Sequence, residues 1–334
     1  MPVMKTAVYG CGSWGTAIAY TLARAGHEVA LVGRDAEQIA EMRRTSENKK
    51  YLPGVVLPAN LTPCTDLTEI ATDVVFLAVP SHVVRETVVK IRSELKPAAI
   101  LVNTAKGLEE GSHLRLSQVI EQEAPGHPVV ALSGPSHAEE VSREVATAVV
   151  VASRDERAAE KVQEMIMTPF FRVYVNRDLI GVELGGALKN VIAICAGALE
   201  SHKSLDNTKA ALLTRGLTEM TRLGVAMGAN AITFSGLSGL GDLIVTCTSR
   251  HSRNLRAGRA LASGKTLTEV LDEIGMVVEG VRATRAAYEL SRTLNISMPI
   301  TEKAYQVLFE NVSIETVLYD LMSRGKKQEY EDLK

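Results

Sequence analysis

Short apolar runs and helical patterns alternate through the first half of the chain. Runs rich in β-branched residues predict strands at 6–9, 28–32, 74–79, 99–103, 129–133 and 148–152. Between the first two runs, residues 16–25 have helical spacing and end at Gly26. Runs this apolar are typical of strands buried on both faces. The alternation therefore predicts an α/β fold with a Rossmann-type, doubly wound, mostly parallel sheet.

After the strand-like segment 170–175 the pattern becomes almost entirely helical. Helical spacing covers 182–201, 207–227, 254–263, 281–294 and 300–310. A length of 334 residues also favours two domains over one. We therefore predict one domain at 1–178 and an all-α C-terminal domain at 179–334.

Composition excludes several classes of function. The net charge of −2 gives no overall field that would favour nucleic acid or an anionic membrane. The four cysteines show no CxxC spacing and no histidine cluster accompanies them, so we expect neither a metal site nor a disulfide framework. The chain shows no signal peptide and no uninterrupted apolar stretch of membrane-spanning length, which predicts a cytoplasmic protein without membrane insertion.

A glycine motif follows the first predicted strand and opens the first predicted helix. It reads Gly10-Cys11-Gly12-Ser13-Trp14-Gly15, which is GxGxxG spacing in the context that binds dinucleotides. Gly10 permits the tight turn, Gly12 lets the backbone approach the pyrophosphate, and Gly15 allows close helix–strand packing. The N–H groups at the helix start face the phosphates, so we assign Ser13 and Trp14 to the cofactor with the three glycines. A glycine turn without a ligand is the alternative.

The end of the second predicted strand bears on the choice between NAD and NADP. A strict NAD enzyme usually has a carboxylate there that binds the ribose 2′-hydroxyl. Here the strand ends Leu31-Val32-Gly33-Arg34-Asp35. Arg34 can pair with a 2′-phosphate or stack on adenine, unless it is only a solvated surface arginine. The sequence predicts that NADPH is accepted, and it does not exclude NAD.

Lys189 lies off the apolar stripe of its predicted helix. At about 100° per residue, one face carries the bulky side chains of Leu184, Leu188, Val191, Ile192 and Cys195. Lys189 shares another strip with small residues that leave room against the helix, namely Gly186, Ala193 and Gly197. A lysine can take up the proton of a hydroxyl group if burial or a neighbouring cation lowers its pKa. A lysine that only snorkels from an interface is the alternative.

Two strand ends offer further polar groups. Lys106 follows the strand that ends at Asn103, and ligands of open α/β sheets lie at the carboxyl ends of strands. A generic surface lysine is equally compatible with this position. Gly134 and Ser136 follow another strand, where Gly134 exposes backbone and Ser136 offers a hydroxyl. A plain strand-to-helix turn with a capping serine explains that pair as well.

The segment 252–254 introduces a predicted helix. Ser252 is a plausible N-cap, and a helix N-terminus that carries Ser252, Arg253 and Asn254 would form a compact phosphate receptor. Further arginines lie nearby at 250, 256 and 259, so a solvated basic face is the rival interpretation.

Taken together, these segments resemble the bacterial NAD(P)-dependent glycerol-3-phosphate dehydrogenases over nearly the whole length. The blocks that carry the resemblance are GCGSWGTA at 10–17, NTAKGLE at 103–109, LSGPSHA at 132–138, ELGGALKNV at 183–191, LSGLGDL at 237–243, SRHSRN at 249–254 and VVEGV at 277–281. The chain departs from the family at Cys11, where alanine is commoner. A thiol there could make the cofactor site sensitive to oxidants.

The resemblance implies reversible hydride transfer between NAD(P)H and dihydroxyacetone phosphate or sn-glycerol 3-phosphate, which supplies phospholipid synthesis. It makes Lys189 the proton acceptor, and it assigns to the substrate Lys106, Gly134, Ser136, Asp242, Ser252, Arg253 and Asn254. To the cofactor it assigns Lys106, Ala138, Arg253, Val277 and Glu279. Without the resemblance, Asp242 would be a turn residue and Glu279 an acid at a helix start.

Two alternatives stay open at this stage. One is a related two-domain dehydrogenase that acts on a β-hydroxyacid or ketopantoate, although a carboxylate substrate would not require the phosphate receptor at 252–254. The other is a nicotinamide-binding sensor without turnover, which would have no need of Lys189. The partner we expect is therefore a small phosphorylated substrate. The helical domain could also pair with a second copy to form a homodimer.

Overall fold

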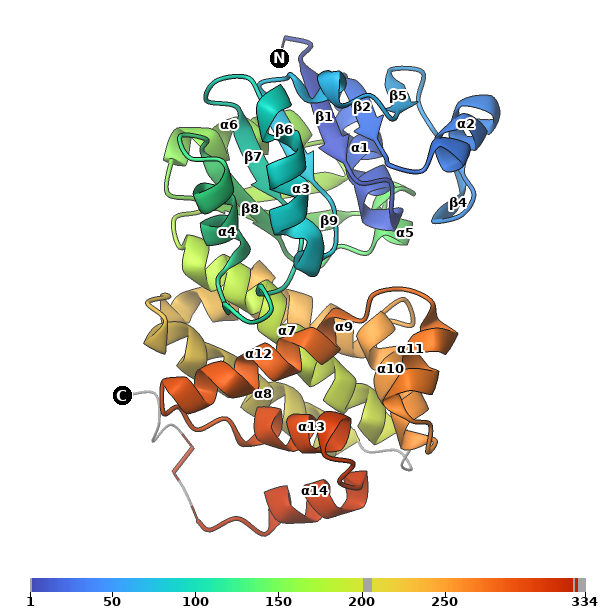
Figure 1. Cartoon of the computed structure of the whole chain (residues 1–334). Helices are drawn as coiled ribbons and strands as arrows, with labels where there is room; N and C mark the ends of the chain where they lie inside the picture. Colours follow the sequence, from blue (N-terminus) through green and yellow to red (C-terminus); the bar gives the residue numbers. More distant parts are fainter. Residues whose placement is uncertain (1, 201–205, 327, 330–334) are drawn as a thin grey trace. The chain divides into compact units, whose positions relative to one another are not determined.

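The computed structural model describes residues 2–200, 206–326 and 328–329, which form two compact units (Figure 1). One unit comprises Met1–Ala105 with Leu114–Val182, and the other comprises Lys106–His113 with Glu183–Lys334. The boundary predicted from the sequence, between 178 and 179, differs from this division chiefly at Lys106–His113. This segment follows a strand of the first unit but groups with the helices, because ion pairs and hydrogen bonds tie it to them.

A sheet of eight strands forms the centre of the first unit, in the order β10-β9-β8-β7-β6-β1-β2-β5. The strands are β1 (Lys5–Tyr9), β2 (Glu28–Val32), β5 (Leu61–Cys64), β6 (Val74–Leu77), β7 (Ile100–Asn103), β8 (Val129–Ser133), β9 (Thr147–Ser153) and β10 (Phe171–Asn176). Neighbouring strands are parallel except for β8 and β9. The mostly parallel sheet predicted from the apolar runs is confirmed. The sequence did not reveal β5, a short edge strand that contains Pro63, a residue that sheets tolerate mainly at their edges.

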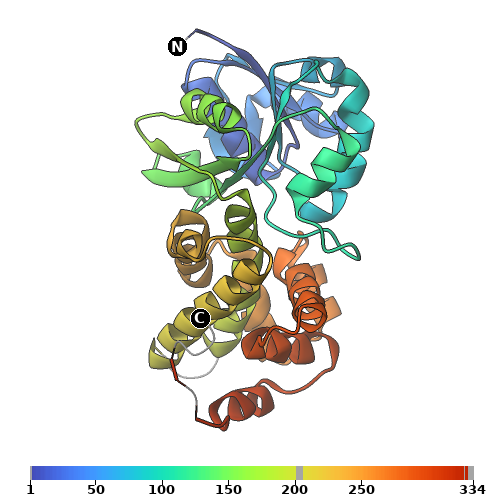
Figure 2. The same ribbon diagram turned by 90° about the vertical axis from the view of Figure 1, so that its left-hand side faces the viewer.

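Helices cover both faces of this sheet (Figures 1 and 2). One apolar core lies between the sheet and α1 (Ser13–Arg24) and α6 (Glu156–Ile166), and the other between the sheet and α3 (Val84–Ile91) and α4 (Leu116–Glu123). Alternate strand residues enter the two cores, as Val8 and Ala7 of β1 do. The unit also contains α2 (Ala36–Thr45), α5 (Ala138–Val141) and a small antiparallel pair, β3 (Glu47–Asn48) with β4 (Leu52–Val56).

The second unit is built from helices. These are α7 (Leu179–Glu200, which begins in the first unit), α8 (Asp206–Ala226), α9 (Asp242–Thr248), α10 (Arg253–Ala262), α11 (Leu267–Ile274), α12 (Glu279–Thr293), α13 (Pro299–Phe309) and α14 (Ile314–Met322). The all-α character predicted for this half is confirmed. The helix predicted over 182–201 reaches Glu200, and Ser201 lies outside the described residues. The sequence missed α9, α11 and α14, which are each only seven to nine residues long.

Helix α7 is the core of the helical unit. Among the described residues, it is the one helix long and apolar enough to cross a membrane by length and composition. The chain has no uninterrupted apolar stretch of that length, as predicted, because Glu183 and Lys189 interrupt the apolar residues of α7. Of its most apolar window, 89% is buried inside the structure, as expected for the central helix of a folded domain.

Part of the small-residue strip of α7 accommodates another helix. A Cβ atom added at Gly197 would lie 2.0 Å from the carbonyl oxygen of Leu255 in α10. A Cβ atom at Gly258 of α10 would likewise lie 2.0 Å from the carbonyl oxygen of Ile194 in α7. The room predicted at Gly197 is thus filled by the backbone of α10, not by a ligand. This close approach brings the N-terminal half of α10, which starts at the predicted phosphate receptor, onto the helix that carries Lys189.

Candidate functional site

The glycine motif forms the turn between β1 and α1, where the strand order of the sheet reverses. Tyr9 accepts a hydrogen bond from the Ala78 amide beyond β6 (2.8 Å), so the ends of the two central strands lie side by side. Gly10 has φ of +119°, and a Cβ atom there would lie 2.4 Å from the Ala78 carbonyl oxygen. A Cβ atom at Gly15 would lie 1.9 Å from the carbonyl oxygen of Gly10. Both glycines are therefore required by the backbone, as the sequence motif implied.

The turn fits a dinucleotide. No side chain caps the N-terminus of α1, whose N-cap residue is Gly12. A Cβ atom at Gly12 would meet nothing within 4 Å, so this glycine borders open space. The indole nitrogen of Trp14 is buried and has no hydrogen-bond partner among the described residues. An uncapped helix start that faces open space is suited to a pyrophosphate.

The carboxylate close to the end of β2, that of Asp35, serves as a helix cap. A Cβ atom at Gly33 would lie 2.2 Å from the sulfur of Cys11, so this thiol excludes a side chain at position 33. The Asp35 carboxylate caps α2, since its Oδ1 atom accepts hydrogen bonds from the amides of Glu37 and Gln38, each at 3.1 Å. Arg34, between them, is exposed.

The Cys11 thiol itself is buried, and this burial raises its pKa to about 12. Because the thiolate is the form that oxidants attack, the structure disfavours the oxidant sensitivity that the sequence suggested for this position.

The turn after β8 carries three further candidate residues of the sheet unit, Gly134, Ser136 and Ala138. Gly134 has φ of +125°, and a Cβ atom there would lie 3.1 Å from the Cα atom of Val149. The Ser136 hydroxyl donates to the Gly134 carbonyl oxygen (3.0 Å), and Ala138 begins α5. Ser136 is half-buried and Ala138 is buried. The serine closes its own turn instead of capping α5 through its side chain, because the N-cap of that helix is His137.

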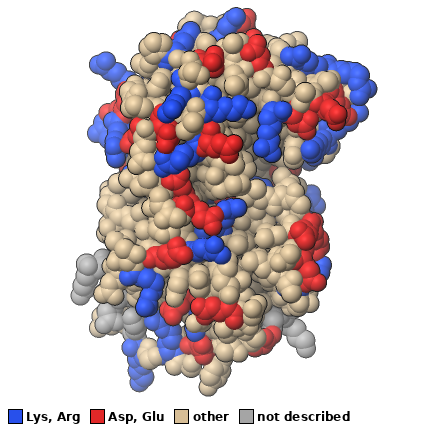
Figure 3. All heavy atoms as spheres, in the orientation of Figure 1, with Lys and Arg blue, Asp and Glu red and all other residues tan. Residues whose placement is uncertain are grey.

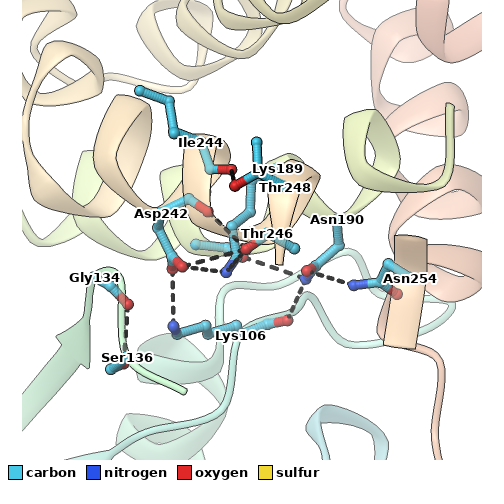
Figure 4. A network of polar contacts seen from close by, with 11 residues as sticks. Lys106, Gly134, Ser136, Lys189, Asn190, Asp242, Ile244, Thr246, Thr248 and Asn254 are labelled. Atoms are coloured by element: carbon cyan, nitrogen blue, oxygen red, sulfur yellow. Dashed lines mark hydrogen bonds and ion pairs between the residues drawn. The ribbon is translucent and has the colours of Figure 1, made fainter. Parts of the chain in front are cut away.

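The helical unit contains a buried cluster of two lysines on one carboxylate (Figure 4). The Lys106 ammonium lies 2.8 Å from Oδ2 of Asp242, and the Lys189 ammonium is paired with Oδ1 of the same residue. The exposed fractions of the side chains are 18% for Lys106, 5% for Lys189 and 1% for Asp242. Lys189 also donates to the hydroxyl oxygen of Thr246 (2.7 Å), which itself donates to the Asp242 carbonyl oxygen (2.6 Å).

The cluster sets the charge state of its members. Burial lowers the pKa of the Lys189 ammonium from its ordinary value to about 7; the Lys106 cation acts in the same direction, while the Asp242 carboxylate opposes the fall. Burial also tends to raise the pKa of the Asp242 carboxyl group, but the two ammonium groups outweigh burial and hold that pKa below its ordinary value. Asp242 is thus a permanent anion, while Lys189 can gain or lose a proton near neutral pH.

Two asparagines join this cluster to the start of α10 (Figure 4). The Asn190 side chain donates to the Lys106 carbonyl oxygen (3.2 Å) and accepts from the Asn254 side chain (2.8 Å). Asn254 in turn accepts from the Gly280 amide in the first turn of α12 (2.9 Å). These bonds use one N–H group and one lone pair of the Asn254 side chain and fix its amide group at the helix start.

Ser252 and Arg253 complete the start of α10. Ser252 is the N-cap, and its side-chain oxygen accepts from the Leu255 amide (3.2 Å), which leaves its hydroxyl hydrogen to donate elsewhere. Arg253 is half-buried, as are Val277 and Glu279 beside Gly280. The arrangement is a helix N-terminus with a hydroxyl and a guanidinium group, which can hold a phosphate.

The structure thus brings together the candidate residues of the helical unit. Lys106, Lys189 and Asp242 are in direct contact, and Asn190 and Asn254 connect them to the first turn of α12. The remaining candidates, at 10–15, 34 and 134–138, belong to the sheet unit.

Sequence reasoning missed Thr246 and Asn190. Thr246 follows Asp242 by four residues, which is the spacing of one helical face. That signal was hidden because α9 was not predicted. Asn190 adjoins Lys189 in sequence but received no role there.

Comparison with known proteins identifies the family. Residues 5–159 match the family model of the NAD-dependent glycerol-3-phosphate dehydrogenase N-terminus, and residues 178–319 match that of the C-terminus. The chain is 62% identical over 330 residues to a glycerol-3-phosphate dehydrogenase [NAD(P)+] of Desulfitobacterium hafniense, covering 98% of this chain and 94% of the relative. It is 50% identical to the enzyme of the same name from Lysinibacillus sphaericus, with 99% of both chains covered.

A solved structure shows the same fold. The crystal structure of glycerol-3-phosphate dehydrogenase from Coxiella burnetii superposes with a TM-score of 0.92 at 36% identity. The match covers 96% of this chain and 99% of that one.

Proposed function

The chain belongs to the family of NAD(P)-dependent glycerol-3-phosphate dehydrogenases, and from this premise we propose which residues perform the reaction. The observation that carries the proposal is the buried pair of lysines on the single carboxylate of Asp242. One of the two, Lys189, has a pKa of about 7, so it can exchange a proton with a substrate oxygen at physiological pH.

Lys189 handles the proton in both directions. During oxidation its neutral amine accepts the proton of the C2 hydroxyl group of glycerol 3-phosphate. During reduction its ammonium form donates a proton to the C2 carbonyl oxygen of dihydroxyacetone phosphate. NAD(P), when bound, supplies the acceptor or donor of the hydride at C2. Thr246 and Asp242 hold the Lys189 nitrogen in place by hydrogen bonds.

Lys106 acts as a fixed cation. Its ammonium group is held by Asp242 and is less buried than that of Lys189, so it can orient the substrate and polarise the C2 oxygen. The substrate phosphate binds at the start of α10, through the hydroxyl of Ser252, the guanidinium of Arg253 and the backbone N–H of Asn254. The family resemblance also assigns Gly134 and Ser136 of the sheet unit to the substrate.

The cofactor binds through the glycine turn. The pyrophosphate lies on the N-terminus of α1 at Gly12, Ser13 and Trp14, and the adenosine ribose lies toward Arg34. Lys106, Ala138, Arg253, Val277 and Glu279 are the remaining contacts that the family resemblance assigns to the cofactor.

We expect the rate of oxidation to depend on the charge of Lys189. For glycerol 3-phosphate, kcat/KM should rise with pH up to about 7 and level off above it, because only the neutral amine accepts a proton. For dihydroxyacetone phosphate, kcat/KM should be level below about 7 and fall above it. The midpoint should move to higher pH in Lys106→Met, since the Lys106 cation lowers the pKa of Lys189. An unmoved midpoint in that variant would contradict the assignment.

The cofactor preference offers a separate test. Arg34→Ala should raise the KM for NADPH by about tenfold and leave that for NADH within twofold, because one charge-assisted contact to the 2′-phosphate is worth roughly 1–2 kcal/mol. Arg44→Ala, which alters another arginine in the last turn of α2, is the matched control. An equal effect of Arg34→Ala on both cofactors would refute this role for Arg34.

Spectrophotometry with NADPH and dihydroxyacetone phosphate tests the function as a whole. Absorbance of the reduced nicotinamide should fall, and dihydroxyacetone without its phosphate should be a far poorer substrate. Reduction of ketopantoate by NADPH, or oxidation of a β-hydroxyacid by NADP+, in the absence of turnover with dihydroxyacetone phosphate would favour the alternative dehydrogenases. Cofactor binding with no turnover of any of these would favour a sensor.

The proposal extends to the setting of the enzyme. Glycerol 3-phosphate produced in the cytoplasm would supply phospholipid synthesis, which fits a chain whose apolar helix α7 is buried core. A homodimer formed through the helical unit is a further part of this proposal.

A further inference from the structure

The segment that carries Lys106 is fastened to α12 at its far end. This segment, Lys106–His113, groups with the helical unit although it follows strand β7 of the sheet unit. At its start, Asp242 holds the Lys106 ammonium and Asn190 holds the Lys106 carbonyl oxygen. In its middle, Leu108 is buried. Its far end reaches α12 through the side chains of Glu110 and His113.

Glu110 pairs with two arginines of α12. One carboxylate oxygen contacts Arg282, and the other lies 3.4 Å from a guanidinium nitrogen of Arg285. The guanidinium carbon of Arg285 also lies 4.6 Å from the ring centre of Phe309 in α13, which restricts its motion. The side chains of Glu110, Arg282 and Arg285 are 48%, 37% and 45% exposed, so each single pair is weak on its own.

His113 makes the second attachment. Its Nε2 atom lies 3.1 Å from a carboxylate oxygen of Glu289, and its backbone has a positive φ of 56°. Arg282, Arg285 and Glu289 are spaced by three and four residues, which places them on one face of α12. Along α12, Arg282 and Arg285 precede Glu289, and along the segment Glu110 precedes His113. The two arginines therefore contact the Glu110 carboxylate, and Glu289 contacts the His113 imidazole. Figure 3 shows acidic and basic side chains interleaved over the face of the helical unit that α12 crosses in Figure 1.

We propose that Glu110 and His113 form a latch on α12 that fixes the position of the Lys106 ammonium, so that Glu110 is a positioning residue for the reaction. Helix α12 suits this task because its first turn is bonded to Asn254 through Gly280. A single helix, α12, therefore fixes the position of the segment that carries Lys106 and also the position of the start of α10. The latch acts through Lys106, so this inference rests on the proposed function.

The first test measures the latch without reference to activity. In Glu110→Gln, amide hydrogen exchange of residues 106–113 should be about fivefold faster than in the wild type, the effect of losing one exposed ion pair. Exchange in the β7 peptide should not change. Glu156 is as exposed as Glu110 and pairs with Arg177 in the sheet unit, so Glu156→Gln should leave exchange at 106–113 unaltered. Unchanged exchange in Glu110→Gln would overturn the latch whatever Lys106 does.

The second test is a double-mutant cycle. Glu110→Gln should lower kcat for dihydroxyacetone phosphate by about fivefold, with the melting temperature and the KM for NADPH retained, and Glu110→Gln/His113→Asn should lower kcat further. In a Lys106→Ala background, Glu110→Gln should cause no additional loss, because the latch acts through that lysine. A full further fivefold loss there would overturn the positioning role. Unaltered turnover in Lys106→Ala alone would instead refute the role proposed for Lys106, and with it the purpose of the latch.

Discussion

Lys189→Ala should reduce turnover of dihydroxyacetone phosphate by 10²–10⁴-fold, the usual contribution of a positioned general acid or base (on the order of 3–5 kcal/mol). The variant keeps the glycine turn and Arg34, so the Kd for NADPH should stay within about twofold of the wild type. The loss should appear in kcat and kcat/KM alike, because the proton moves in the transition state. Steady-state kinetics and cofactor titration of the same preparation measure both quantities.

The substitution also removes a buried ammonium, so stability must be followed alongside activity. The Lys189 side chain is 5% exposed and makes two hydrogen bonds, and alanine leaves a cavity beside Asp242. Lys303→Ala is a matched control in the same unit, since Lys303 is a largely buried lysine paired with Asp320 of α14. We expect that control to change kcat by less than about threefold. Wild-type turnover in Lys189→Ala would rule out Lys189 as the proton acceptor.

Asp242→Asn should have the second largest effect. It keeps the shape of the side chain but leaves two ammonium groups without their shared anion in a buried site. Breaking one partner of a buried ion pair costs about 3–5 kcal/mol, and displaced lysines should lower kcat by about 10²-fold. Both changes are measurable, the first by denaturant unfolding and the second by steady-state kinetics.

The pH dependence of the stability that Asp242→Asn loses tests whether the loss is electrostatic. The carboxylate raises the pKa of Lys189, so Asp242→Asn should move that pKa below about 7. A lysine whose folded-state pKa lies below its unfolded value binds more protons when unfolded, so stability rises with pH between the two values. The free energy of unfolding of Asp242→Asn should therefore fall further below that of the wild type at pH 6 than at pH 9, where Lys189 is neutral in both proteins. An equal deficit at the two pH values would point to packing instead of charge.

Asp320→Asn provides the comparison for that experiment. Asp320 also binds a lysine ammonium, Lys303, at 2.7 Å, but its side chain is 43% exposed. Because solvent screens such a pair, its loss should cost no more than about 1 kcal/mol. The contrast between the two aspartates compares a buried carboxylate that holds two lysines with an exposed one that holds a single lysine.

The sequence by itself determined the architecture and the cofactor turn. Short continuous apolar runs and helical spacing of period 3.6 are local properties, so they predicted the parallel sheet and the long helices α7, α8 and α12. The glycines at 10, 12 and 15 belong to one turn of the backbone, so their spacing in the sequence was sufficient to predict that turn. Lys189 stood out because its helical position is also set locally.

Only the tertiary structure decided what surrounds Lys189. The bond from Lys106 to Asp242 spans 136 residues and that from Lys189 to Asp242 spans 53, and no local pattern records such contacts. Short helices such as α9 have too few residues to show a period, so Thr246 had no visible place. The segment Lys106–His113 follows a strand of the sheet unit in sequence and yet packs with the helices, because its charges are satisfied by Asp242 and α12, far along the chain.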